Sequence, residues 1–325
     1  MKLKVAVLCG GRTGEHEVSL RSAESIIAAM DPSRYQVERI FINKEGHWEP
    51  RALTPEPGRN PGIDVVFPVL HGTFGEDGTV QGLLELAGLP YVGAGVLASS
   101  VSMDKEVMKR LMRERGLPVA DYLVLRRGKF RAREVCGRFP FPVFVKPANL
   151  GSSVGISKAK TCEELVAALD LAAQFDRKIL VERGIEGREF ECSVLGNDDP
   201  VAAVPCEILP SRDFYDYEDK YLLNQARTVV PAELSPAQTA EVQRLAVACY
   251  QAVDCEGMAR VDFLLEAATG QFFINEINTI PGFTSISMYP KMWEASGLAY
   301  PKLIDRLIEL AMERHRARQS TRYSR

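Results

Sequence analysis

Two segments near the C-terminal end of the chain carry polar side chains inside apolar stretches. In FFINEINTIPG the alternation of a strand places Glu276 and Asn278 on one face. In MARVDFLLEA Arg260 and Asp262 share a face, and the short turn ATG between the segments predicts that the two strands pair antiparallel. Carboxylate and amide oxygens, without histidine or cysteine, are the ligands that Mg²⁺ prefers. The segments therefore predict a magnesium site, with a buried ion pair between Arg260 and one of the acids as the alternative.

A lysine and a loop of small residues precede these strands in the chain. Lys146 lies in VFVKP, whose other residues are apolar, so its ammonium group requires an anion nearby. The loop NLGSSVG follows, and its backbone amides can approach phosphate oxygens while its glycines allow it to close over them. The loop alone is also typical of an ordinary turn. The order of lysine, flexible loop and oxygen-bearing strands indicates a phosphate-binding site.

The elements that must position these residues fall into three successive blocks. Residues 1–94 alternate strands and helices, which predicts a Rossmann-like parallel sheet with crossover helices. Residues 95–186 contain a helix from about Asp104 and strands on both sides of the glycine-serine loop. Residues 187–325 contain successive strands, among them PVAAVPCEIL, and a final helix from about Pro301. The predicted class is α/β and α+β, with a parallel-sheet domain, a small central domain and a C-terminal domain with a mixed or antiparallel sheet.

Composition limits the classes of function. The 325 residues are 46% hydrophobic and 26% charged with a net charge of -3, as in a globular chain of two or three domains. This charge gives no indication of a nucleic-acid partner, and the basic end RHRARQSTRYSR is interpreted as a solvated helix terminus. No stretch approaches the length of an apolar membrane span. Seven scattered cysteines, never spaced C-x-x-C, predict reduced, mostly buried thiols and a cytoplasmic location.

These segments and several others resemble the D-alanine-D-alanine ligase family of ATP-grasp enzymes. The resemblance covers nearly the whole chain and implies an ATP-grasp fold. It also implies ATP-dependent joining of two D-alanines, through an acyl phosphate, into the dipeptide used for peptidoglycan. The expected cofactors are ATP and two Mg²⁺ or Mn²⁺ ions; a homodimer is left open. The segments that carry the resemblance are LCGGRTGEHEVSL (8–20), HGTFGEDGTVQG (71–82), SMDK (102–105), VKPANLGSSVG (145–155), FYDYEDKY (214–221), and GMARVDFLL with INEINTIPGFTS (257–285).

The resemblance assigns the metal and nucleotide roles. It implies that Asp262, Glu276 and Asn278 hold two Mg²⁺ ions, with Glu276 shared between them. The residues it places at ATP are Lys105, Lys146, Ser153, Glu182, Ile185, Glu189 and Lys220. The three lysines would contact phosphates, for which a compact point charge is suited. The backbone at Glu182 and Ile185 would bind adenine, and Glu189 would bind the ribose.

The resemblance also assigns the substrate and catalytic roles. Glu15 would pair with the ammonium group of the first D-alanine, close to His71, whose ring Glu76 would orient. Arg260 and the backbone amide of Gly282 would form the oxyanion hole for a tetrahedral intermediate. The residues expected at the carboxylate of the second substrate are Ser287 and Met288. The residues expected to take part in catalysis are Glu15, Ser152, Tyr221, Arg260 and Gly282.

Two polar segments, 149–155 and 211–227, are expected to act as lids that exclude water from the intermediate. By the resemblance, Tyr221 is linked through Ser152 to Glu15, which closes the second lid and favours D-alanine over a hydroxy acid. The alternative for Tyr221 is a packing aromatic, and the alternative for Glu15 is an acid that suits a helix N-terminus.

Other functions remain as alternatives. A dinucleotide-binding dehydrogenase could explain GGRTG, but the second strand ends at Asn43 without the acid that would hold a ribose hydroxyl. A regulator built on an inactive fold of this type should lack the metal residues or Arg260, and this chain has both. The nearest alternative is a related ligase that takes D-lactate or D-serine as its second substrate.

Overall fold

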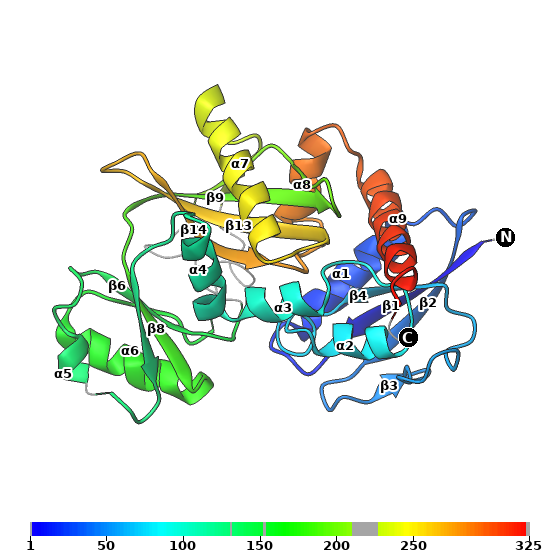
Figure 1. Ribbon diagram of the computed structural model, residues 1–325, viewed down its shortest axis with the longest axis horizontal. Coiled ribbons are helices and arrows are strands. Elements are labelled where there is room, and N and C mark those ends of the chain that lie inside the picture. The colour runs from blue at the N-terminus through cyan, green and yellow to red at the C-terminus, as the bar shows by residue number, and fades with distance from the viewer. Residues whose placement is uncertain (1, 131, 152–153, 210–226, 323–325) are drawn as a thin grey trace.

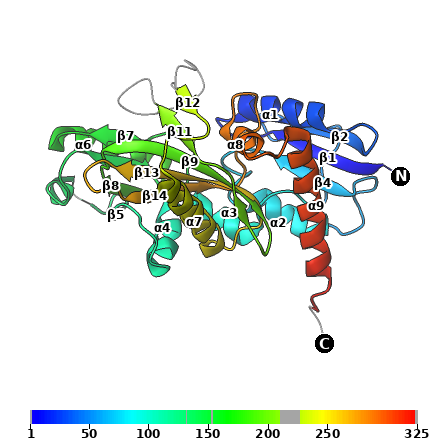
Figure 2. The same ribbon diagram turned by 90° about the horizontal axis from the view of Figure 1, so that it is seen from above.

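The computed structural model describes residues 2–130, 132–151, 154–209 and 227–322, which form three β-sheets with helices packed on them. Both views place the first sheet at one end of the molecule, the second at the other end and the third between them (Figures 1 and 2). One sheet is mainly parallel and two are antiparallel, so the predicted α/β and α+β class is confirmed.

The first sheet has the strand order β3-β2-β1-β4. Its elements are β1 (Leu3–Gly10), α1 (His16–Ala29), β2 (Tyr35–Ile42), β3 (Trp48–Glu49), β4 (Val65–Val69) and α2 (Thr79–Leu86). β1 pairs parallel with β2 and with β4, and only the short edge strand β3 is antiparallel. β4 is buried along its whole length, as expected for a parallel strand whose two faces are both covered. The predicted parallel sheet is confirmed.

The second sheet is antiparallel, in the order β5-β8-β6-β7. This part of the chain contains α3 (Val96–Met103), α4 (Lys105–Glu114), β5 (Tyr122–Arg126), α5 (Ala132–Val135), β6 (Val143–Pro147), β7 (Ser157–Ala159), α6 (Cys162–Phe175) and β8 (Lys178–Arg183). α4 begins as predicted, because the Asp104 carboxylate accepts hydrogen bonds from the amides of Glu106 and Val107 at 3.2 and 3.1 Å. Its buried face carries Lys105 and Lys109 beside two methionines.

The third sheet has the order β12-β11-β9-β13-β14, with β10 also paired to β9. Its elements are β9 (Gly187–Gly196), β10 (Val201–Ala202), β11 (Cys206–Leu209), β12 (Arg227–Val229), α7 (Pro236–Ala252), β13 (Gly257–Glu266), β14 (Phe272–Asn278), α8 (Met288–Ala295) and α9 (Tyr300–Gln319). The prediction of one strand over PVAAVPCEIL is wrong, since the segment divides into β10 and β11. Pro205, which lacks an amide donor, stands immediately before β11.

The final helix, α9, packs against the first sheet although it lies at the other end of the chain (Figure 1). Tyr35 Oη donates to Asp305 Oδ1 at 2.7 Å, which joins β2 to this helix. The three sheets fall within the predicted ranges 1–94, 95–186 and 187–325, and that division into domains stays a prediction. No helix in the described part of the chain has both the length and the apolar character for a membrane crossing.

The prediction that every cysteine is reduced is wrong for two of the seven. Cys136 and Cys162 form a disulfide, with their Cα atoms 5.7 Å apart. α5 and α6 pack against each other at the edge of the second sheet, which brings together residues 26 positions apart in the sequence. Their spacing alone does not indicate this contact. The other five cysteines are free and buried, as predicted.

Helix α7 offers a test of stability that leaves the cavities untouched. Ser235 caps it reciprocally: its Oγ accepts from the Gln238 amide at 3.3 Å, and the Gln238 side chain accepts from the Ser235 amide at 3.1 Å. We expect Ser235→Ala to lower the free energy of unfolding by about 1 kcal/mol, the usual cost of a lost N-cap. Urea denaturation measures this loss. An unchanged midpoint would show that water replaces the cap without cost.

Candidate functional site

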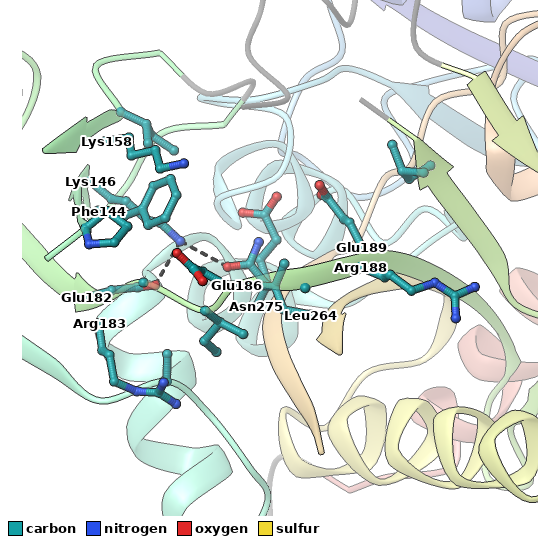
Figure 3. Close-up of a pocket in the computed structure, with 18 of the residues that line it drawn as sticks. Phe144, Lys146, Lys158, Glu182, Arg183, Glu186, Arg188, Glu189, Leu264 and Asn275 are labelled. Atoms are coloured by element: carbon teal, nitrogen blue, oxygen red, sulfur yellow. Dashed lines mark hydrogen bonds and ion pairs between the residues drawn. The ribbon is translucent and has the colours of Figure 1, made fainter. Parts of the chain in front are cut away.

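A cavity of about 410 Å³ lies between the second and third sheets (Figure 3). Lys146 on β6, Glu182 on β8 and Asn275 on β14 line it. Ile185 and Glu189, from the segment that leads into and begins β9, line it as well. The cavity therefore collects side chains from both sheets where the two meet.

Lys146 has the anion that its burial requires. Its Nζ donates to Glu182 Oε2 at 2.8 Å and to Asn275 Oδ1 at 3.0 Å, as the dashed lines in Figure 3 show. Lys146 and Glu182 lie on neighbouring antiparallel strands, which sets their side chains within reach of each other. In this structure the partner of the lysine is therefore a protein carboxylate.

Lys105, the first residue of α4, reaches the same region from the helix. It is buried, and its Nζ donates to the Leu150 carbonyl at 2.6 Å. The same Nζ lies 3.5 Å from Glu276 Oε2. This lysine thus connects the start of the glycine-serine loop to β14.

A second, larger cavity of about 780 Å³ lies between the first and third sheets. Its first-sheet side is formed by residues that follow the carboxyl ends of β1 and β4, among them Glu15 and His71. Ligands of open parallel sheets bind at that edge. Glu276 and Gly151 line both cavities, so the two spaces meet at these residues.

Arg260 lies at the centre of an ionic cluster on the third sheet. Its Nε and Nη2 donate to the two carboxylate oxygens of Asp262, each at 2.7 Å, and its Nε lies 3.3 Å from Glu191 Oε2. Burial acts to lower the pKa of Arg260, but the two carboxylates outweigh it and hold the pKa above its ordinary value. Asp262 stands opposite Glu276 and Arg260 opposite Asn278, as expected from the antiparallel pairing.

The ring of His71 is fixed by two hydrogen bonds. Nδ1 lies 3.0 Å from the Ile280 carbonyl and Nε2 lies 3.2 Å from Ser22 Oγ. Since a carbonyl can only accept, Nδ1 carries the proton and Nε2 accepts from the serine. Burial lowers the pKa of His71, which favours this neutral form.

Glu76 accepts instead from two backbone amides, that of Gly72 at 2.7 Å and that of Ile280 at 3.1 Å. The prediction that Glu76 orients His71 is therefore wrong. Burial raises the pKa of Glu76 to about 8, and the nearby charge of Glu15 adds to the shift. The raised pKa favours the neutral form of Glu76, which limits the negative charge next to Glu15.

Close backbone approaches shape the second cavity. A Cβ at Gly72 would lie 2.6 Å from Glu15 Oε2, so glycine at this position lets that carboxylate lie against the loop after β4. A Cβ at Gly282 would lie 2.7 Å from Ser287 Oγ, so glycine allows the start of α8 to approach the segment after β14. The amide of Gly282 is thereby held at the edge of the cavity that Arg260 lines.

Both halves of the chain match known family models. The model described as D-ala D-ala ligase N-terminus matches residues 4–62 and 49–94, and that described as D-ala D-ala ligase C-terminus matches residues 111–309. The chain belongs to the D-alanine-D-alanine ligase family. The D-alanine-D-alanine ligase of Solibacter usitatus is 67% identical over the full length of both chains.

Solved structures of ligases from this family have the same fold. The D-alanine-D-alanine ligase of Coxiella burnetii superposes with a TM-score of 0.87 at 40% identity, covering 98% of this chain and 96% of that one. VanG D-Ala:D-Ser ligase of Enterococcus faecalis gives a TM-score of 0.88 at 35% identity, covering 96% of this chain and 100% of that one. The predicted ATP-grasp fold is confirmed by these neighbours.

The structure brings most of the predicted ligase residues to the two cavities. Those at the first cavity are Lys105, Lys146, Glu182, Ile185, Glu189 and Glu276. Those at the second are Glu15, His71, Arg260, Glu276, Asn278, Gly282, Ser287 and Met288. Four more, Ser152, Ser153, Lys220 and Tyr221, lie outside the described residues. Their roles, and the lid predicted over 211–227, of which 211–226 lie outside the described residues, stay predictions.

The residues expected to hold metal fit Mg²⁺ in chemistry. Asp262 and Glu276 face each other across two strands, and Asn278 Nδ2 donates to Asp262 Oδ2 at 3.1 Å. In the described part of the chain no three acidic, histidine or cysteine side chains gather as a metal group. Two carboxylates and one amide leave several positions of an octahedron to water and phosphate, as is usual for Mg²⁺. Asp262 also accepts from Arg260, so the guanidinium and a cation would share this carboxylate.

Three residues of the site were not predicted. Asn275 meets Lys146 because the β13–β14 register shifts between Asp262 and Phe263, which leaves Asn275 out of the paired register. Glu191 reaches Arg260 from β9, and Lys109 reaches Glu182 from α4. The bulge has no signal in the sequence. Neither charged residue carried one, because Lys109 stands among the other charged residues of KEVMKRLMRE and Glu191 follows the charged residues of GREFECSVLG.

Proposed function

We propose that the protein joins two D-alanines into D-alanyl-D-alanine, converting ATP to ADP and phosphate, to supply the dipeptide of peptidoglycan. The observation that carries this proposal is the meeting of two cavities at Glu276. The first cavity has lysines for phosphates, and the second has a carboxylate and an arginine for amino-acid groups. A cytoplasmic location accompanies the proposal, since ATP is available there, and a homodimer stays open.

In the proposed nucleotide site, Lys105 and Lys146 bind ATP phosphates as point charges. The backbone at Glu182 and Ile185 binds adenine, and Glu189 binds the ribose. Asp262, Glu276 and Asn278 hold two Mg²⁺ or Mn²⁺ ions. When bound, these ions neutralise charge on the phosphates and align the γ-phosphoryl group with the acceptor oxygen.

In the proposed reaction, Glu15 holds the ammonium group of the first D-alanine. A carboxylate oxygen of that D-alanine then attacks the γ-phosphorus of ATP. The bond from that phosphorus to ADP breaks, which leaves D-alanyl phosphate. The amine of the second D-alanine, whose carboxylate lies at Ser287 and Met288, then attacks the carbonyl carbon. Arg260 and the Gly282 amide stabilise the negative oxygen of the tetrahedral intermediate. Phosphate then leaves as the peptide bond forms and takes up the proton that the attacking nitrogen loses.

The second substrate is what must be tested, because the chain is also similar to a D-Ala:D-Ser ligase. We expect rapid ADP release with D-alanine alone, and D-alanyl-D-alanine as the main product when D-serine or D-lactate is also present at pH 7. A coupled ADP assay with mass spectrometry of the products measures both. A faster rate of ADP release and a mixed product with D-serine would identify the protein as a D-serine ligase. The absence of ADP release with every acceptor would reject the proposal.

A further inference from the structure

Lys109 is a charged residue at the centre of the protein that the proposed reaction does not use. It lies on α4, is 0% exposed, and is among the largest fully buried side chains. It is not one of the described residues that line either cavity. A buried ammonium group is costly unless it is paired. Its presence therefore requires an explanation.

The partner of Lys109 is a carboxylate that already has another partner. Lys109 Nζ lies 3.3 Å from Glu182 Oε1, while Glu182 Oε2 accepts from Lys146 Nζ at 2.8 Å. One carboxylate thus pairs with two ammonium groups. Lys146 lines the cavity together with Glu182 (Figure 3), whereas Lys109 is fully buried and is not in the described lining. When all three groups are ionised they carry one net positive charge, and Lys146 is the ammonium group that lines the cavity.

The two lysines differ in how strongly their charges lower the pKa of Glu182. Burial acts to raise the pKa of Glu182, but the charges of Lys109 and then Lys146 outweigh it, so the carboxyl stays ionised. Burial is the main cause that lowers the pKa of Lys109, and the charge of Lys146 adds to it. Lys109 supplies the larger of the two charge effects on Glu182, and it does so from a fully buried position outside the described lining of the cavity.

We propose that Lys109 is a positioning residue for ATP: it remains the counter-ion of Glu182, so that Lys146 can transfer its hydrogen bond from Glu182 to a phosphate. This inference rests on the proposed nucleotide site. Without Lys109, Glu182 would have only Lys146 as its counter-ion, and the pair would be neutral. ATP would then have to break a buried ion pair to gain the lysine, and part of its binding energy would be lost.

The test compares Lys109→Met with the double variant Lys109→Met/Glu182→Gln. We expect Lys109→Met to raise the Kd and the KM for ATP at least about tenfold, with the KM for D-alanine unchanged. Glutamine at 182 removes the negative charge that retains Lys146, so the double variant should return to within about threefold of the wild-type ATP affinity. Titration calorimetry with ATP and Mg²⁺ and steady-state kinetics measure these values.

Two results would overturn the proposal. One is an unchanged ATP affinity in folded Lys109→Met. The other is a double variant whose affinity for ATP is tenfold or more lower than that of the wild type. Removing the charge of Glu182 would then fail to restore binding, and Lys109 would act only by stabilising the fold. If Lys109→Met does not fold, the double variant still decides, because it removes Lys109 and the charge of Glu182 together and leaves Lys146 its hydrogen bond to Asn275. Wild-type protein that binds no ATP would instead reject the proposed function.

Lys178→Met is the matched control. Lys178 is also a buried lysine of the second sheet, and its Nζ donates to Asp104 Oδ1 at 2.6 Å and to Glu106 Oε2 at 2.9 Å. It is absent from the described lining of the first cavity. We expect this variant to lose thermal stability while its KM for ATP stays within about twofold of the wild type. An equal rise in KM would show that any buried lysine of this region has the same effect, which would contradict a specific role for Lys109.

Discussion

Glu276→Gln is expected to abolish ADP formation while the protein stays folded. Glu276 lines both cavities, stands opposite Asp262 and lies 3.5 Å from the ammonium group of Lys105. A glutamine has almost the same size and keeps one carbonyl oxygen, but it lacks the charge that the proposed binding of two cations requires. The coupled ADP assay measures the loss, and the thermal midpoint reports the fold.

Glu266→Gln is the control for this substitution. Glu266 ends β13, and its carboxylate accepts from Arg183 Nη1 at 2.6 Å and from Thr269 Oγ1 at 2.7 Å. It is a strand carboxylate of the same sheet that does not appear in the described lining of either cavity. The control should keep its turnover. If Glu276→Gln also turned over normally, the shared metal role would have to be abandoned.

The polar face of β13 and β14 could be predicted from the sequence, because strand alternation and a short turn are local properties. Arg260 and Asp262 do stand opposite Asn278 and Glu276. Asn275 could not be placed in the same way. It faces Lys146 only because of a register shift between the strands, and the partner strand, not the local alternation, sets that shift.

Contacts between segments that lie far apart in the sequence could not be predicted either, because they too depend on a partner segment and not on the local pattern. The carbonyl that fixes the His71 ring belongs to Ile280, 209 positions further along the chain. The family resemblance suggested Glu76, a near neighbour in sequence, but its oxygens accept from two backbone amides instead. The family resemblance predicted which residues would contact the nucleotide, the metal ions and the substrates. It gave no indication of the residues behind them, such as Lys109, whose partners follow from packing.

Arg260→Ala is expected to lower kcat by about a hundred- to thousandfold, the usual loss when one oxyanion donor is removed. Arg260 lines the second cavity with Gly282, and it is not among the described residues of the first, so the Kd for ATP should stay close to the wild-type value. Arg260→Lys should recover only part of the rate, because a lysine cannot reproduce the planar fork that now holds Asp262. Single-turnover kinetics separate the chemical step from product release.

The alternative for Arg260 is a structural ion pair with Asp262 and Glu191, and a second arginine distinguishes the two roles. Arg51 makes the same forked contact with Glu38, at 2.9 and 2.7 Å, in the first sheet and away from the described lining of both cavities. Arg51→Ala should lower the thermal midpoint slightly and leave kcat unchanged, since a partly exposed pair adds little stability. If Arg260→Ala behaved in the same way, with a lower midpoint and a kcat within a few-fold of the wild type, the ion pair would be its whole role. A loss of kcat without a matching loss of stability places the guanidinium at the reacting carbonyl.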